Sequence, residues 1–198
     1  MSAKAALLKA IAPVNRGLTM TKAQKQAIFS AAAYLEDVNP HPQPTAVPEL
    51  LSGNWRMLFT TSEELLGIDR LPLFQLGAIY QCIRADQGKI YNVAEILGLP
   101  LLNPLMNGFV SVCASFTVVS ERRVKVNFDR FVAGSQPLIN YRDVDQFIDL
   151  LTARPKLLAL DFPIKRKNQR GWLETTYLDH NLRLGRGNEG NLFVLAKS

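Results

Sequence analysis

From Gly53 onward the sequence is a series of short runs rich in β-branched and aromatic residues, separated by turn signals. Such runs are typical of strands, and their short spacing is typical of hairpins. Helical patterns do not alternate with the runs, so a parallel sheet built from strand–helix–strand units is not expected. An open antiparallel sheet would leave two unpaired edges, and closure removes them. The pattern therefore predicts a mainly β chain that forms an antiparallel barrel of about eight strands.

The expected strands come as one single strand, two hairpins and a final group of three: 54–62, 77–96, 108–134 and 171–198. The first hairpin turns at Ala85-Asp86-Gln87-Gly88 and the second turns near Ser120-Glu121, where turn residues interrupt the apolar runs. Between the second hairpin and the final group, residues 143–153 are expected to form a short helix.

Two helices are expected before the strands. The first covers about Ala3–Ala12 and ends at Pro13, because proline cannot continue a helix. The second has Thr19 or Thr21 as its N-cap and runs to about Asp37, with alanines and large apolar residues along one side.

The stretch 39–50 is rich in proline and can be neither a helix nor a central strand. It is the natural connector between the helices and the strands. We therefore expect one domain overall, in which a helical segment, 1–38, packs on a barrel, 39–198.

Residues Gly185 to Gly190 match the dinucleotide-binding pattern G-x-G-x-x-G. That pattern requires a helix directly after the glycines, because the helix N-terminus holds the pyrophosphate. The strand-like run Asn191–Leu195 follows instead, so the glycines are better explained as bend residues of a hairpin. Asp179-His180 places an acid beside a base, but Asp and Asn are typical turn residues, so Asp179-His180-Asn181 is better explained as a turn. On a strand the side chains of Asp179 and His180 would point to opposite faces and could not pair. We expect neither a nucleotide loop nor a catalytic pair here.

The chain offers little material for a metal centre or a redox site. His41 and His180 are its only histidines, so a multi-histidine metal site is not available. Cys82 and Cys113 lie in apolar strand-like runs, and we expect buried thiols, as in a reducing compartment. We expect no catalytic residue, no metal and no cofactor.

Arg130 stands out among the charged residues. Alternate positions of the run 124–132 are apolar apart from Arg130, which predicts that Arg130 faces the core together with Phe128. A buried arginine needs a partner. That partner is either an internal carboxylate, such as Asp179 or Glu95, or the anionic head group of a ligand.

Gly53-Asn54-Trp55 at the first strand has the G-x-W form that also opens lipocalin-type barrels. Trp55 would close one end of the barrel, with Arg183 or Arg186 from a late strand lying across its ring. A barrel of eight strands is wide enough to enclose one small apolar ligand. The candidate ligand-binding residues are Trp55, Phe59, Tyr80, Phe128, Arg130 and Tyr177.

Two further features suggest contact with a lipid surface. The connector 96–106 is unusually apolar, and if exposed it would mark an interaction site; its alternative is a lid packed on the barrel end. The candidate membrane-contact residues are Leu99, Leu101, Leu102, Leu105 and Met106. The basic cluster Lys165-Arg166-Lys167 with Arg170 would meet anionic head groups, unless it is a solvated turn. Prolines interrupt the uncharged stretch 96–120, so a spanning helix is not expected.

The segments "LLSGNWRMLFTTS" and "LETTYLDHNLRLGRGNEGNLFVL" resemble the plastid lipid-associated protein/fibrillin (plastoglobulin) family of chloroplasts and cyanobacteria. In the second segment the matching positions are Tyr177, Asp179, Arg183, Gly185, Arg186, Gly187, Gly190 and Asn191. Many members have an acidic residue after that aspartate, where this chain has His180, which argues further against a catalytic histidine.

The resemblance implies a lipocalin-like barrel that binds or coats carotenoids, prenylquinones or other lipids at thylakoid or lipid-globule surfaces. It implies roles in lipid storage and photo-oxidative stress, and in some plant members a partnership with a prenyl diphosphate synthase. No signal or transit peptide is recognisable, which leads us to expect either a cyanobacterial protein or a mature form. For a cyanobacterial protein we expect the cytoplasmic side of thylakoid membranes or lipid globules.

The first hypothesis is thus non-enzymatic binding or coating of hydrophobic molecules, without a nucleic-acid partner. The alternative is an enzyme or enzyme partner in prenylquinone or bilin metabolism that uses a barrel cavity. Such an enzyme would need converging polar groups in the cavity, for which Arg130, Glu95 and Asp179 are the candidates.

Overall fold

A computed structural model of the chain describes residues 2–66, 74–98, 106–165 and 171–198. Within these ranges nine strands form one sheet in the order β4-β3-β2-β1-β9-β8-β7-β5-β6. Strand β4 also pairs with β5, so the sheet closes into a ring, and β6 extends from β5 outside that ring. Every pairing is antiparallel. The expected mainly β, antiparallel fold is confirmed.

The strands are β1 Gly53–Thr60, β2 Phe74–Arg84, β3 Lys89–Gly98, β4 Gly108–Val118, β5 Arg123–Ser135, β6 Leu160–Pro163, β7 Gly171–Leu178, β8 Leu182–Gly187 and β9 Leu192–Lys197. The α-helices are α1 Ala3–Ile11, α2 Lys22–Asp37, α3 Pro48–Leu51, α4 Glu63–Leu66 and α5 Val144–Ala153. Short 3₁₀ turns are η1 Ala12–Gly17, η2 Pro44–Ala46, η4 Ala85–Gln87 and η6 Pro137–Ile139. The helices over 3–12, 19–37 and 143–153 were expected, whereas β6 was not.

Local signals fix the start of α2. The hydroxyl of Thr21 accepts a hydrogen bond from the Gln24 amide at 3.2 Å, and the Gln24 side chain accepts one from the Thr21 amide at 2.9 Å. This reciprocal pair satisfies two amides that would otherwise lack partners at the helix end. The structure therefore selects Thr21, and not Thr19, as the N-cap.

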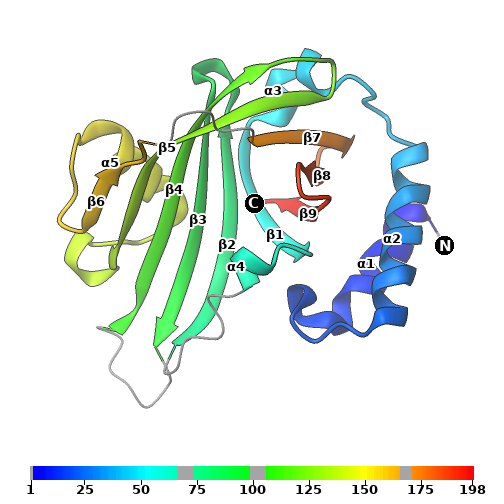
Figure 1. Cartoon of the computed structure of the whole chain (residues 1–198), viewed down its shortest axis with the longest axis horizontal. Coiled ribbons are helices and arrows are strands. Elements are labelled where there is room, and N and C mark those ends of the chain that lie inside the picture. Colours follow the sequence, from blue (N-terminus) through cyan, green and yellow to red (C-terminus); the bar gives the residue numbers. More distant parts are fainter. Residues whose placement is uncertain (1, 67–73, 99–105, 166–170) are drawn as a thin grey trace.

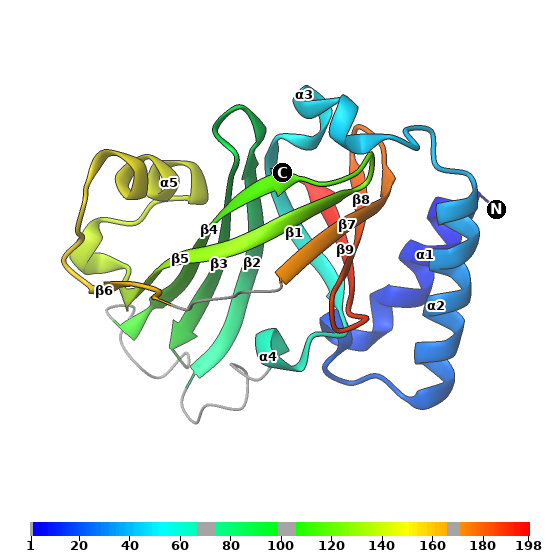
Figure 2. The ribbon, with the colours of Figure 1, turned by 45° about the horizontal axis from the view of Figure 1, so that its top comes forward.

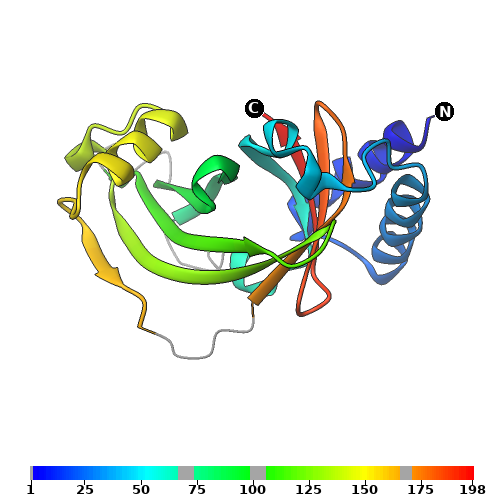
Figure 3. The ribbon, with the colours of Figure 1, turned by 90° about the horizontal axis from the view of Figure 1, so that it is seen from above.

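Two helical layers cover different parts of the outer surface of the ring. The N-terminal pair α1 and α2 packs on an apolar cluster that includes Phe59 of β1 and Leu184 of β8. Helix α5 packs on a second cluster, formed with strands β2 to β5, in which Phe147 contacts Phe109 with ring centroids 4.7 Å apart. Consequently α1 and α2 lie at one end of the molecule, α5 and β6 lie at the other, and the ring lies between them (Figures 1, 2 and 3).

Polar contacts add to the apolar packing of the N-terminal helices on the ring. Lys4 of α1 forms an ion pair with Asp179 at 2.8 Å. Glu36 of α2 accepts two hydrogen bonds from the guanidinium of Arg186, at 2.9 and 2.8 Å, and one from the hydroxyl of Thr176. These helices thus contact the ring through apolar and polar side chains, while the division of one domain into a helical segment, 1–38, and a barrel, 39–198, stays a prediction.

The ring is complete along only half of its length. Strand β1 pairs with β2 through Gly53–Arg56, opposite Tyr80–Ile83, and the earlier part of β2 pairs only with β3. The first part of β5, Arg123–Val126, pairs with β7. The later part, Arg130–Ala133, pairs with β6 at the same edge. The half of the ring that contains Trp55 is therefore closed. In the other half the ring is open, and the inner face of β4 and β5 continues onto β6.

A β-bulge in β5 changes which side chains face inward. Cys113 of β4 is opposite Arg130, but the next residue, Ala114, is opposite Phe128, so Asp129 is an extra residue. An extra residue reverses the alternation of faces. Accordingly Val126 belongs to the inner cluster, whereas Val132 belongs to the cluster under α5. The prediction that positions 124–132 share one face is wrong, and Arg130 faces α5 instead of the barrel interior.

The link between Asp179 and α1 predicts how stability depends on pH. Burial by itself would raise the pKa of Asp179, but hydrogen bonds from Lys4, Tyr177 and the amides of Asn181 and Leu182 lower this pKa to about 2. A carboxyl with a lowered folded-state pKa stabilises the fold above its ordinary value of 3.8 and loses that contribution as the pH falls toward 2. The contribution is about 2 kcal/mol.

We therefore expect Asp179→Asn to lower the free energy of unfolding at pH 7 by about 2 kcal/mol and to flatten its decline between about pH 4 and pH 2. Urea titrations across this range measure both effects. Asp86→Asn, at an exposed turn position, is the control and should behave like the unmodified chain. An unchanged pH dependence in the Asp179 variant would show that the carboxyl is not held in this way.

Candidate functional site: a closed tryptophan end and an open apolar face

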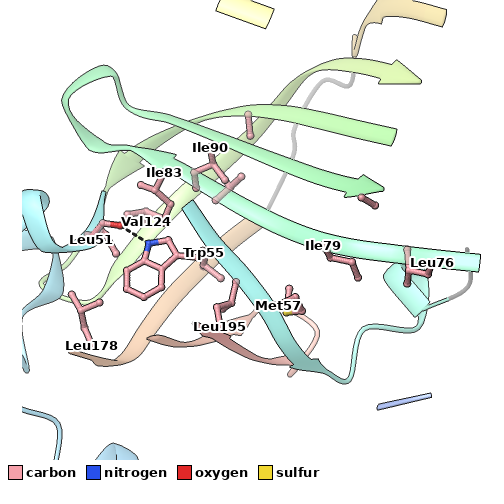
Figure 4. Packing of buried hydrophobic residues seen from close by; sticks show 14 residues of the cluster. Leu51, Trp55, Met57, Leu76, Ile79, Ile83, Ile90, Val124, Leu178 and Leu195 are labelled. Atoms are coloured by element: carbon pink, nitrogen blue, oxygen red, sulfur yellow. Dashed lines mark hydrogen bonds between the residues drawn. The ribbon is translucent and has the colours of Figure 1, made fainter. Parts of the chain in front are cut away.

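Trp55 fills the closed end of the ring. Its side chain is fully buried, and its indole NH donates a 2.8 Å hydrogen bond to the carbonyl of Leu51 (Figure 4). The guanidinium of Arg183 lies 5.4 Å from the ring centroid, and the Nζ atom of Lys197 lies 4.7 Å from it. The expected arginine across Trp55 is therefore Arg183, while Arg186 pairs with Glu36 on the outside.

The inner cluster packs the closed end to near completion. Figure 4 shows Leu51, Ile83, Leu178 and Leu195 around the indole, with Met57, Ile79 and Leu76 further along the interior. A residual cavity of about 10 Å³ remains beside Arg183, which is room for about one water-sized particle. A carotenoid or a prenyl chain does not fit into this end.

The inner face of β4, β5 and β6 is apolar and accessible beyond the closed half. The pairing places Val112, Phe131 and Phe162 in one row, and Val110, Ala133 and Leu160 in the next. Together with Phe128, these residues form what we call the open apolar face: Val110, Val112, Phe128, Phe131, Ala133, Leu160 and Phe162. The rings of Phe131 and Phe162 stack with centroids 5.0 Å apart.

The exposure of this face is unusual for a sheet. Phe128 is 37% exposed, Phe162 is 44% exposed and Leu160 is 62% exposed. An edge strand normally turns polar residues toward water, yet β6 directs its only charged side chain, Asp161, to Arg130 on the side of α5. Contiguous exposed apolar surface marks a site of interaction with a protein, a membrane or an apolar ligand.

Further apolar residues are exposed where β3 ends and β4 begins, and basic residues flank β6. Leu97 at the end of β3 is 39% exposed, and Met106, just before β4, is 40% exposed. Lys156 and Lys165 are exposed on either side of β6. Apolar side chains with basic neighbours are the combination that favours a lipid surface.

The structure does not bring the six predicted ligand-binding residues together. Trp55 belongs to the inner cluster, and Phe128 lies on the open apolar face. Phe59 and Tyr177 point outward into the cluster under α1 and α2, while Tyr80 packs against the cluster under α5.

Register shifts explain why Phe59 and Tyr177 point outward. The pairing of β1 with β9 shifts between Met57 and Phe59, and the pairing of β7 with β8 shifts between Thr175 and Tyr177. Each bulge reverses the alternation that the sequence alone suggests.

Arg130 has an internal carboxylate as its partner. Its guanidinium donates to the two oxygens of Asp161 at 2.9 and 2.7 Å and to the carbonyl of Leu151 at 2.9 Å. The hydrogen bond from Arg130 lowers the pKa of Asp161, whose side chain is only 3% exposed. A carboxylate partner was one of the two expectations, but its identity, Asp161, was not foreseen.

The three polar groups that an enzyme hypothesis required have separate partners. Glu95 accepts a 2.8 Å hydrogen bond from the hydroxyl of Tyr141, Asp179 binds Lys4, and Arg130 binds Asp161. Burial, followed by the hydrogen bond to Glu95, raises the pKa of Tyr141 far above its ordinary value. These contacts link β3 to the segment before α5, the turn between β7 and β8 to α1, and β5 to β6.

The thiols and histidines show no arrangement for chemistry in the part of the chain that the structure describes. Cys82 and Cys113 are buried and free, and burial raises their pKa values to about 12 and about 11, which disfavours the reactive thiolate. The rings of His41 and His180 lie 6.4 Å apart. Within the described ranges no group of three or more His, Cys, Asp or Glu residues could hold a metal ion, and no helix is long and apolar enough to cross a bilayer.

Most predicted membrane-contact residues lie outside the described residues: Leu99, Leu101, Leu102 and Leu105, as do Arg166, Lys167 and Arg170 of the basic cluster. Met106 is described and exposed. Sequence reasoning missed Phe131, Leu160 and Phe162. The signal in the sequence was a large apolar residue at every second position, Leu158, Leu160 and Phe162, which indicates one face of a strand.

Comparison with known proteins gives consistent matches over the whole chain. Residues 1–196 match the model of the PAP_fibrillin family. The light-induced chloroplastic protein of Solanum tuberosum is 30% identical over 92% of this chain and 63% of its own length. Plastoglobulin-1 of Pisum sativum is 31% identical over 98% of this chain and 60% of its own length.

The chromoplast-specific carotenoid-associated protein of Cucumis sativus is 29% identical over 98% of this chain and 67% of its own length. The chain thus spans a little less than two thirds of the length of the Solanum and Pisum proteins. No solved structure is significantly similar to it.

The Arg130–Asp161 pair generates a stability prediction. Arg130→Met would leave the buried carboxylate of Asp161 without its cation, which should lower the free energy of unfolding by about 3 kcal/mol. Adding Asp161→Leu should restore most of that loss, since a buried pair replaced by apolar residues costs little. Urea denaturation of the single and double variants measures the cycle.

Arg123→Met is the matched control on the same strand, because its ion pair with Glu174 is more exposed. It should change the free energy of unfolding by less than about 1 kcal/mol. If Arg130→Met were no more destabilising than Arg123→Met, the structural role of the Arg130 pair would be contradicted, and a role in ligand binding would regain support.

Proposed function

The chain belongs to the PAP_fibrillin family, and from this premise we propose that it binds or coats hydrophobic molecules without catalysing a reaction. The names of similar proteins support a role of this kind: one is a plastoglobulin and others are carotenoid-associated proteins of chromoplasts. The proposed partners are carotenoids, prenylquinones or other lipids at a membrane or lipid-globule surface.

The open apolar face is the observation that carries the proposal. Its aromatic residues, Phe128, Phe131 and Phe162, line a sheet surface that is neither covered by α5 nor filled like the closed end. A long apolar chain laid across it would remove these side chains from water, and each fully buried large side chain contributes about 2 kcal/mol. The face suits elongated apolar molecules better than compact polar ones.

Charge supports the lipid-surface part of the proposal. The chain carries a formal net charge of +6, and the exposed residues Lys156 and Lys165 flank β6. Anionic head groups attract basic residues near a membrane by about 1 kcal/mol for each residue. Apolar contact through β6 and electrostatic attraction by these two lysines would act together on a lipid surface that meets β6.

Location and physiological role follow from the same proposal. The similar proteins are chloroplastic or chromoplastic, which supports thylakoid membranes or lipid globules as the site of action, in a cyanobacterium the cytoplasmic side. Lipid storage and photo-oxidative protection are the roles that carotenoid or quinone binding would serve. An enzyme or a synthase partner remains the alternative, and the separate partners of Arg130, Glu95 and Asp179 give a cavity enzyme no support.

Co-flotation with vesicles of phosphatidylcholine, phosphatidylglycerol and β-carotene tests the role of the open apolar face. We expect Leu160→Asp combined with Phe162→Asp to weaken partition at least about tenfold, since two large apolar side chains lose their transfer to the lipid. Tyr34→Asp combined with Val38→Asp is the control, because Tyr34 on α2 and Val38 at its C-cap are exposed at the opposite end of the molecule. Equal flotation of the two double variants would refute this face as the contact surface.

A second flotation experiment addresses the apolar connector predicted from the sequence. Replacing Leu101, Leu102 and Leu105 together by Asp should abolish flotation with anionic vesicles if the connector inserts among the lipids. Circular dichroism should show an unchanged β content in the variant. Flotation equal to that of the unmodified chain would exclude the connector as an anchor. The open apolar face would then remain as the candidate contact surface.

A further inference from the structure

Arg183 is a fully buried cation at the closed end of the ring. Its side chain has 0% exposure, and among the described residues it forms no ion pair with a carboxylate. Its Nη2 atom donates to the side-chain carbonyl of Gln81, whereas Nε and Nη1 have no hydrogen-bond partner within the described ranges. Burial lowers its pKa to about 9, so the guanidinium stays charged at neutral pH. A buried charge of this kind is costly unless something compensates it.

Lys197 adds a second positive charge close to Trp55, again without a carboxylate partner among the described residues. The Nζ atom of Lys197 lies 4.7 Å from the centroid of Trp55 and donates to the carbonyls of Leu50 and Ser52 at 2.9 and 2.6 Å. Burial and the nearby Arg183 lower the pKa of Lys197. The indole of Trp55, which both cations approach, stabilises cations through its ring face, but it does not supply a negative charge.

The residual cavity lies beside Arg183. It measures about 10 Å³ and is lined by Arg183, Arg122, Thr45, Thr175 and apolar side chains of the inner cluster. A volume of this size accommodates one particle of about the size of a water molecule. It excludes a carboxylate, a phosphate or any organic head group.

The charge of Arg183 favours an anion over a water molecule in this cavity. The arginine side chains can only donate hydrogen bonds, and the hydroxyl of Thr45 donates its single proton to the carbonyl of Ser120 or Glu121, at 3.1 and 2.8 Å. A water molecule could accept from Nε and Nη1, but it would leave the charge of the buried guanidinium without a counter-charge. A monoatomic anion accepts these hydrogen bonds, and it also offsets the charge of Arg183.

We therefore propose that the closed end of the ring holds one small monoatomic anion of the size of chloride, bound by Nε and Nη1 of Arg183. The anion completes the hydrogen bonding of the guanidinium and balances the two cations around Trp55. It is a structural ligand, separate from the open apolar face, and its presence does not depend on lipid binding. The stability of the fold should then depend on the kind of anion and not only on ionic strength.

Crystals of the full chain soaked in sodium bromide test the site directly through anomalous scattering at the bromine edge. The expected result is a peak inside the closed end, next to Nε and Nη1 of Arg183. Peaks confined to exposed lysine and arginine side chains, or a cavity that contains only water, would overturn the proposal. This measurement uses the unmodified chain, so it does not depend on the folding of any variant.

Thermal unfolding in sodium chloride and in sodium gluconate at equal ionic strength gives the solution test. Chloride should raise Tm by about 5 °C along a saturable curve, because gluconate is too large for the cavity. Arg183→Met removes the donors, and Val124→Leu fills the cavity while it keeps the arginine; both should lose the chloride-specific increase. Arg186→Met, on the same strand but outside the cavity, should keep it. An equal Tm in the two salts, or a full increase in Val124→Leu, would contradict the site.

Discussion

The contact of Trp55 with Arg183 and Lys197 is the interaction on which the rest of the structure depends. It joins the first strand of the ring to the last two strands, and the hydrogen bond from the indole to Leu51 fixes where the preceding connector enters. Because this group fills the interior at one end, side chains leave no room for a lipid in that half of the ring. Apolar surface available to a lipid must therefore lie elsewhere, and the inner face of β4, β5 and β6 provides it.

The arrangement of the helices explains why that surface remains accessible. Helices α1 and α2 cover the outside of the strands around β8, and α5 covers the outside of β2 to β5. The Arg130–Asp161 pair and the carbonyl of Leu151 attach β6 to α5. This attachment turns Leu160 and Phe162 to the opposite side, next to Phe131. Arg130, one of the polar residues that a cavity enzyme would have needed, thus orients an apolar surface through its pair with Asp161.

The sequence was informative wherever a local signal decided the outcome. Turn residues at Ala85–Gly88, the N-cap at Thr21 and the apolar run of α5 each act within a few residues, and the corresponding elements were found. An arginine across the ring of Trp55 was also foreseen, but the sequence left Arg183 and Arg186 as alternatives, and the structure selects Arg183. The side on which Phe59, Arg130 and Tyr177 lie was not foreseen, because each follows a β-bulge whose extra residue is determined by the neighbouring strand. Strand β6 was missed because it is short and depends on its pairing with β5.

Hydrogen–deuterium exchange of the full chain, with and without carotenoid-containing lipid vesicles, tests the central claim most directly. If a lipid lies on the open apolar face, amide exchange should slow in 128–135 and 158–165, while the strands around Trp55 exchange as before, because that end is already filled. Protection confined to the N-terminal helices, or to the tip of the β4–β5 hairpin, would contradict the assignment of this face as the site of lipid contact.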